Sequence, residues 1–265
     1  MVDYQQVRFA TEPFLDLRQR TLRSLKAQRA VAAMGPPVPA RILDCGCGEG
    51  ALTRTLKRTF PAAEVHGCDV SAVHLQRARA VGLAVEYRCM TEALPYADAE
   101  FDVVLVLDVL EHVDRPDMLL RDVARVLRGG GRLLLHCPCE GQPLMLHWLA
   151  WKLRIGHNLK RDLIGHIQRF THRQVLALAA GAGLRCTMVR YQYHLIGQIT
   201  DFLVFYKKWC RRKDESGRAS WFEKALANAP TWRLVALLES LSYFESRLFA
   251  RLPAAMGIDA VFEKQ

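Results

Sequence analysis

The sequence predicts an α/β protein with a doubly wound, mostly parallel sheet of seven strands and a helical lid or insertion. Apolar strands and amphipathic helices alternate from residue 41 to residue 137, which is the pattern of βαβ units. Continuous apolar runs, such as V-V-L-V-L at 103–107, are typical of parallel strands that are buried on both faces. Ligands bind such sheets beyond the carboxyl ends of the strands, so the site is expected at that edge.

The bulk composition limits the classes of protein and partner. A chain of 265 residues with 51% hydrophobic side chains can build one large domain, or a domain with a lid. The net charge of +10 suits nucleic acid or an anionic membrane, although a solvated basic surface is the simpler explanation. We expect no nucleic-acid partner, because no basic and aromatic nucleic-acid motif is present.

The early charges of Asp3, Arg8 and Glu12 argue against a signal peptide. No uncharged stretch approaches the roughly 18 residues that span a bilayer. The eight cysteines include no C-x-x-C pair, and they are expected to be small buried hydrophobes that bind no zinc. We therefore expect a cytoplasmic location, with peripheral contact at an anionic membrane as an option.

The first half of the chain divides into a helical segment at 1–39 and a core at 40–139. Residues 1–34 are predicted to be helical, and the run G-P-P-V-P ends that helix. The apolar face of this helix consists of Phe14, Leu15, Leu22, Leu25 and Val31. The strands of the core are predicted at 41–45, 64–68, 84–88, 101–107 and 131–137. The helices between them are predicted at 49–59, 71–81 and 115–128.

The second half is predicted to add a lid, a return to the core and an insertion. The alternation stops after Cys139, so residues 140–170 are assigned to the lid. The core continues at 171–193, where Thr171 is an N-cap candidate. The elements predicted there are a helix at 172–181 and a strand at 184–191. Residues 194–255 are expected to form a helical insertion that caps the substrate, interrupted by a charged loop at 207–215. Residues 256–265 are expected to hold a closing strand, at 257–262.

The most informative segment is I-L-D-C-G-C-G-E-G at 42–50, followed nineteen residues later by Asp69. Glycines in a turn after a strand allow a ligand to approach the backbone closely. An acid at the end of the next strand is placed to bind ribose hydroxyls, as in dinucleotide folds. Asp44 would repel a phosphate and attract an ammonium group, which favours a nucleoside that carries an amino acid. The alternative role for Asp69 is the N-cap of the next helix.

These segments resemble the motifs of class I S-adenosylmethionine-dependent methyltransferases, and in particular the small-molecule, ubiquinone-biosynthesis-type group. The matching segments, in order, are 42–50, 68–71, 90–104, 107–113 and 127–135. The resemblance implies a Rossmann-like methyltransferase fold, S-adenosyl-L-methionine as cofactor and methyl transfer to a lipophilic small molecule. A hydroxyl oxygen is the expected acceptor. The alternatives are a C-methyltransferase of the same fold and a non-catalytic S-adenosylmethionine-binding accessory protein.

The resemblance also implies roles for individual residues. Asp44 would face the amino end of the cofactor, Asp69 would bind the ribose hydroxyls, and Val70 would pack on adenine. Backbone access and packing are implied for Gly46, Cys47 and Gly48. The adenine loop would consist of Met90, Thr91 and Glu92, in which Met90 replaces the aspartate that is common in the family. The methionyl part would lie against Leu107 and Asp108.

A hydroxyl acceptor requires a base, and histidine is the usual choice near neutral pH. His112, after the fourth strand, and His166, at the end of the lid, are the candidates. We expect no metal, because Glu111 and His112 also suit the start of the next helix. The alternative is a divalent metal held by Asp108, Glu111 and His112, with His136 or His166 as a further ligand.

Apolar side chains of the lid and the insertion are expected to select the acceptor. The lid contributes Trp148, Trp151, Leu153, Ile155 and His157. The insertion contributes Leu195, Ile196, Ile199, Phe202, Leu203, Phe205, Tyr206, Trp209, Trp221, Phe222, Trp232, Leu237, Leu238, Tyr243 and Phe244. Ordinary core packing, an apolar substrate tunnel and a membrane-facing surface are all compatible with this pattern. The membrane interpretation draws on the basic residues Lys207, Lys208, Arg211, Arg212 and Lys213.

Overall fold

The computed structural model describes residues 13–82, 85–89, 93–155, 159–218 and 220–265. Its centre is a seven-stranded sheet in the order β3-β2-β1-β4-β5-β7-β6. The strands are β1 (Arg41–Cys45), β2 (Glu64–Asp69), β3 (Glu86–Cys89), β4 (Phe101–Leu107), β5 (Leu127–Pro138), β6 (Leu184–Gln192) and β7 (Gly257–Lys264). Only β7 pairs antiparallel, with β5 and with β6. The predicted fold class is therefore confirmed.

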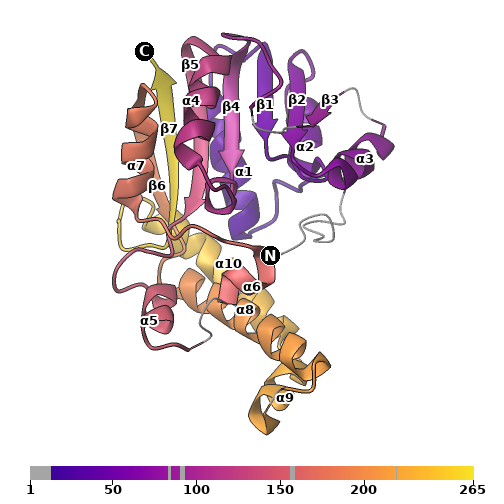
Figure 1. The fold of residues 1–265 in the computed structure, drawn as a ribbon, viewed down its shortest axis with the longest axis vertical. Coiled ribbons are helices and arrows are strands. Elements are labelled where there is room, and N and C mark those ends of the chain that lie inside the picture. The colour runs from indigo at the N-terminus through magenta and orange to yellow at the C-terminus, as the bar shows by residue number, and fades with distance from the viewer. Residues whose placement is uncertain (1–12, 83–84, 90–92, 156–158, 219) are drawn as a thin grey trace.

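Helices cover both faces of the sheet and extend beyond one end of it (Figure 1). They are α1 (Leu22–Met34), α2 (Ala51–Thr59), α3 (Ala72–Ala80), α4 (Pro116–Val126), α5 (Leu146–Lys152), α6 (Leu159–Ile164), α7 (His172–Gly181), α8 (Leu195–Glu215), α9 (Trp221–Asn228) and α10 (Trp232–Leu248), with a 3-10 turn η1 (Leu110–His112). Figure 1 shows α5, α6, α8 and α10 beyond the carboxyl ends of the parallel strands, with α9 at the far tip. The chain reverses its direction of winding between β1 and β4, which makes this end the expected ligand edge.

The continuous apolar run of β4 is explained by two hydrophobic layers. Val104 and Val106 pack in the cluster that includes Val123 of α4. Val103 and Leu105 pack in the cluster on the other side, with residues of α1 and α2. Each face of this strand is covered by helices, so neither set of side chains alternates with polar residues.

The N-terminal segment differs from the predicted long helix. The helix begins at Leu22, where Thr21 accepts a hydrogen bond from the Ser24 amide. Residues 13–21 are irregular and pack on α2 instead, because the Leu15 amide bonds the Thr55 hydroxyl at 2.9 Å and Arg58 lies over the Phe14 ring. The predicted helical residues before position 13 lie outside the described part of the chain.

The predicted charged loop at 207–215 is wrong, because α8 runs through it to Glu215. Its basic side chains are strong helix formers, and neighbouring elements satisfy several of them. Lys207 donates to the Thr231 hydroxyl at 2.8 Å, and Lys213 pairs with Glu223 at 2.5 Å. The helix predicted at 172–181 is confirmed, with a capping box formed by Thr171 and Gln174.

Candidate active site

The glycine loop follows β1 and is clamped to the neighbouring strand. The amides of Gly46 and Cys47 both donate to the Cys68 carbonyl, at 2.8 and 3.0 Å. Gly46 and Gly48 have φ values of +79° and +54°, a region that favours glycine. A Cβ atom at position 46 would lie 2.4 Å from Val109 Cγ2, whereas nothing lies within 4 Å of one at position 48. Gly46 is therefore required by the protein's own packing, and Gly48 faces open space where a ligand can approach.

Asp69, at the end of β2, holds the glycine loop in place. Its carboxylate accepts hydrogen bonds from the Gly48 amide at 2.8 Å and from the Ser71 amide at 2.9 Å. The N-cap of α3 is Ser71, which accepts from the His74 amide, so Asp69 does not have that role. Val70 is 56% exposed next to Asp69 in the chain, so its side chain is accessible to a ligand.

Asp44 is a buried acid at the end of β1. Its carboxylate accepts a hydrogen bond from the Thr53 hydroxyl at 2.7 Å. Burial, helped by the nearby charge of Asp69 and opposed by the Thr53 bond, raises the pKa of Asp44 to about 6. A cation placed beside this carboxylate would offset the cost of burying its charge.

Leu107 and Asp108, at the end of β4, contact other parts of the protein, and their predicted role beside the methionyl group stays a prediction. Leu107 packs with the cluster on the α1 side of the sheet. Asp108 has a φ of +57° and forms ion pairs with Lys26 of α1 and with His136, whose Nε2 lies at 3.3 Å. Burial alone would raise the pKa of Asp108, but Lys26 and His136 outweigh it and hold that pKa well below its usual range.

The two candidate bases meet at the end of β4. Their rings, His112 and His166, pack edge to face with centroids 4.8 Å apart. The lid junction brings His166 there, because the amides of Ile167 and Gln168 both donate to the Glu111 carbonyl, at 2.9 and 3.1 Å. Burial, with a contribution from His166, lowers the pKa of His112 to about 4. His112 is therefore neutral at pH 7.

Glu111 lies between these histidines on η1, and not at the start of α4. Its side chain is fully buried, and neither carboxylate oxygen has a hydrogen-bond partner among the described residues. Oε1 lies 3.8 Å from Nε2 of His112 and 3.8 Å from Nε2 of His166. Burial, with the charge of Asp108, raises the pKa of Glu111 well above its usual range. Ligand atoms of these three residues lie within 4.8 Å of one another.

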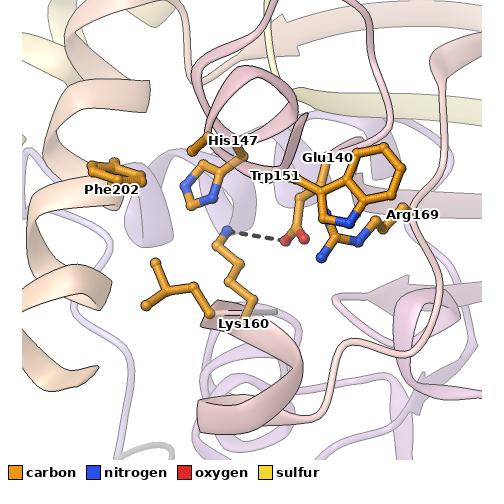
Figure 2. Close-up of a pocket in the computed structure, with 8 residues that line it drawn as sticks. Glu140, His147, Trp151, Lys160, Arg169 and Phe202 are labelled. Carbon is orange, nitrogen blue, oxygen red and sulfur yellow. Dashed lines mark ion pairs between the residues drawn. The ribbon is translucent and has the colours of Figure 1, made fainter. Parts of the chain in front are cut away.

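A buried ionic network continues from His166 to α5, α6 and α8. Figure 2 shows its Lys160–Glu140 pair. His166 Nδ1 lies 2.6 Å from Glu140, and Lys160 of α6 pairs with Glu140 at 3.2 Å. Lys160 also pairs with Asp201 of α8 at 2.8 Å, and Asp201 contacts His147 of α5 at 2.7 Å. Burial would raise the pKa of Glu140, but Lys160 and His166 hold it well below its usual range. The cavity beside this network is about 10 Å³, which is room for one water.

Comparison with known proteins identifies the core of the chain. The family model described as "Methyltransferase domain" matches residues 43–135. Ubiquinone biosynthesis O-methyltransferase of Parvibaculum lavamentivorans is 38% identical over 109 residues, which are 39% of this chain and 42% of the relative. Ubiquinone/menaquinone biosynthesis C-methyltransferase UbiE of Desulfotalea psychrophila is 29% identical over 204 residues, 69% of this chain and 82% of the relative. Residues 43–135 therefore form a methyltransferase domain of the class I S-adenosylmethionine-dependent type.

Solved structures support the same fold. A putative sarcosine dimethylglycine methyltransferase from Galdieria sulphuraria superposes with a TM-score of 0.58 at 18% identity, over 91% of this chain and 86% of that one. At this identity the likeness concerns the fold alone. The chain also spans less than half the length of the first O-methyltransferase relative.

The cofactor of this methyltransferase is S-adenosyl-L-methionine, and the described residues fit it. The open space at Gly48 suits close approach of the cofactor to the backbone, and exposed Val70 offers a flat apolar contact for adenine. Asp44, poised between its two protonation states, suits the ammonium group. Cys47 is buried against Leu75 and Ala78 beneath the loop. Met90, Thr91 and Glu92 lie outside the described residues.

Sequence reasoning missed the residues that join the site to its cap. Lys26 reaches Asp108 from α1, and Glu140, Lys160 and Asp201 form the ionic network. None of them belongs to a recurring motif. Lys160 is one of several basic residues in the lid, so the sequence holds no signal that singles it out as buried.

Proposed function

We propose that this methyltransferase transfers the methyl group of S-adenosyl-L-methionine to a hydroxyl oxygen on a lipophilic, quinone-related ring compound. The observation that carries the proposal is the pair of neighbouring histidines, His112 and His166, beside a buried and unbonded glutamate at the carboxyl end of β4. A hydroxyl must lose its proton as its oxygen attacks, and a neutral imidazole can take that proton. The curated relatives act in ubiquinone and menaquinone biosynthesis, which supports the acceptor class.

His166 is the better base of the two. Glu140 is held ionised by Lys160, so its carboxylate only accepts hydrogen bonds, and Nδ1 of His166 carries the proton that it accepts. In the neutral ring, Nε2 then holds the lone pair and faces Glu111 and His112. This arrangement fixes the ring and its tautomer, as a carboxylate does for the histidine of a catalytic triad. The cofactor supplies an activated methyl group on a sulfonium.

We infer that the lid at 140–170 and the insertion at 194–255 form one cap over the acceptor. Lys160 of α6 joins Glu140, after β5, to Asp201 of α8. The Leu146 amide at the start of α5 donates to the side chain of Gln198 in α8 at 2.8 Å. These bonds tie both segments together beyond the carboxyl ends of the strands, where substrate is selected in such sheets. His157, which was assigned to the lid, lies outside the described residues.

A divalent cation at Glu111, His112 and His166 is the second candidate arrangement. Two unbonded, buried carboxylate oxygens beside two imidazoles favour it, because such groups are ligands for transition metals. The alternative site suggested by the sequence included Asp108, whose carboxylate instead contacts Lys26 and His136. A bound cation would lower the pKa of the acceptor hydroxyl and orient it.

The test is a methylation assay with catechol and hydroquinone acceptors that carry apolar tails. Product analysis by mass spectrometry and NMR separates an O-methyl from a ring C-methyl product. His166→Asn is expected to lower turnover by about 10²- to 10⁴-fold with S-adenosylmethionine affinity unchanged. His172→Asn, at a buried histidine of α7 whose ring packs against Tyr191, is the matched control.

Three results would contradict parts of the proposal. Unchanged turnover in His166→Asn would show that His166 is not the base. A ring-methylated product would favour the C-methyltransferase alternative. Cofactor binding without turnover on any acceptor favours the accessory protein. Treatment with a chelator separates the two site arrangements, because turnover that is lost and then restored by Mg²⁺, Mn²⁺ or Zn²⁺ supports the cation.

A further inference from the structure

Helix α10 carries a stripe of exposed apolar side chains. Its members are Leu234, Leu237, Leu241, Phe244 and Leu248, and each is between 42% and 77% exposed. They recur at intervals of three and four residues, so they share one face of the helix. The buried residues of α10, Ser242, Tyr243 and Ser246, lie on its other side. One face of α10 therefore packs on the protein, and the opposite face exposes apolar side chains.

Further apolar side chains are exposed near both ends of the helix. Trp232, at the first position of the helix, is 67% exposed, and Phe249 and Leu252 just after the helix are 45% and 48% exposed. Isolated exposed apolar side chains are ordinary, but a contiguous row along a helix marks an interaction surface. Trp and Phe are also the side chains that settle at the boundary between lipid headgroups and acyl chains.

We propose that this face of α10 docks on the surface of an anionic lipid bilayer. The charged side chains exposed along residues 232–252 are Arg233, Arg247 and Arg251. The acids in this stretch, Glu239 and Glu245, are partly buried, and Glu245 is occupied by the amides of Ile196 and Gly197 at 3.0 and 3.1 Å. An apolar stripe bordered only by exposed arginines complements a surface of phosphate headgroups.

The same charges argue against a second copy of the chain as the occupant. A symmetric pairing of two α10 helices would bring two sets of arginines together along one seam, without exposed acids to neutralise them. Insertion across the bilayer is also not indicated, because among the described residues no helix is long and apolar enough to span a membrane. A helix that is held by its polar side and exposed on its apolar side suits an orientation parallel to the surface.

The inference also relocates the membrane contact that the sequence suggested at 207–215. Three of those basic residues are engaged within the protein, Lys207 with Thr231, Arg212 with the Asp162 carbonyl and Lys213 with Glu223. The exposed apolar stripe lies on α10, which runs beside α8 in the cap (Figure 1). The inference rests on the proposed function in one respect, since docking would present the cap to an acceptor dissolved in the bilayer.

The test is co-sedimentation of the full chain with vesicles of phosphatidylcholine, alone or mixed with phosphatidylglycerol. The wild type is expected to sediment with the anionic vesicles and to be released as salt is raised. The triple variant Leu237→Ser, Leu241→Ser, Phe244→Ser is expected to lose at least tenfold in partitioning. Replacing Arg233, Arg247 and Arg251 by glutamine is expected to cost about fivefold per arginine on anionic vesicles only.

Controls separate docking from folding and from catalysis. Met118→Ser, at an exposed apolar residue of α4, is the matched control and should sediment as the wild type does. The α10 and Met118 variants must bind S-adenosylmethionine calorimetrically, which shows that they are folded, and circular dichroism checks the fold of Asp69→Ala. Asp69→Ala should lose the cofactor and still sediment, so failure of the proposed activity and failure of docking are distinguishable. The proposal is overturned if the wild type does not sediment with anionic vesicles, or if the serine variant sediments with them as the wild type does. It is also overturned if ultracentrifugation shows that the wild type is a dimer and the serine variant a monomer.

Discussion

Gly46→Ala should destabilise the protein far more than Gly48→Ala, although both glycines belong to one loop and both have positive φ. The left-handed backbone costs a residue with a Cβ about 1–2 kcal/mol at either position. At position 46 the new atom would also lie 2.4 Å from Val109 Cγ2, and overpacking of a well-packed site costs about 1–3 kcal/mol more. The expected losses are therefore about 2–5 kcal/mol for Gly46→Ala and about 1–2 kcal/mol for Gly48→Ala.

Urea unfolding followed by fluorescence and circular dichroism measures these losses, and a double-mutant cycle isolates the contact. Val109→Ala removes the clashing methyl group, and by itself it should cost about 1.6 kcal/mol for two buried methyl groups. In the Gly46→Ala background the same change should recover about 1–3 kcal/mol of the overlap. Equal losses at the two glycines, or additive losses in the cycle, would refute the assignment of Gly46 to packing. Gly48→Ala should instead weaken S-adenosylmethionine binding, because only that position faces open space.

Three further predictions concern charged groups. Because the pKa of Asp44 is raised to about 6, its proton is favoured in the folded state, so the stability of the cofactor-free protein should fall as pH rises from about 4 to 6. The affinity for S-adenosylmethionine should rise over the same pH range, by up to about tenfold per pH unit below 6. Asp44→Asn should bind the cofactor weakly, with an affinity that does not change with pH. Calorimetry at pH 5–8 measures both affinities. Lys160→Met should cost about 3–5 kcal/mol because it leaves Glu140 and Asp201 buried without a cation, whereas exposed Lys208→Met should change stability by less than about 0.5 kcal/mol in the same urea assay. Asp69→Ala should abolish detectable S-adenosylmethionine binding. Wild-type affinity in this variant would show that the Asp69 carboxylate does not contribute to cofactor binding.

Local sequence determines the strand β4, the start of α7 and the glycine loop, because their causes act within a few residues. The run at 103–107 is apolar throughout because β4 is buried on both faces, and it is a strand over the residues predicted. Thr171 begins α7 because its hydroxyl and the Gln174 side chain satisfy amides within one turn. The positive φ values of the glycine loop likewise favour glycine through the local backbone alone.

Only the tertiary structure decided which charged groups meet. Lys26 pairs with Asp108 across 82 positions of sequence, and His112 contacts the lid across 53, at spacings that no helical or strand period specifies. The basic run at 207–213 is predicted to be a loop because its partners are distant in the sequence. In the folded protein Glu223 of α9 and Thr231 bind two of its lysines. Burial has the same origin, because a carboxylate such as Glu111 acquires its environment only when η1, the lid and β5 close around it. The sequence by itself determined the cofactor loop and the sheet, since turn geometry and strand burial are encoded within a few residues. The acid, base and cap contacts were decided by packing between distant elements, because desolvation and ion pairing act through space.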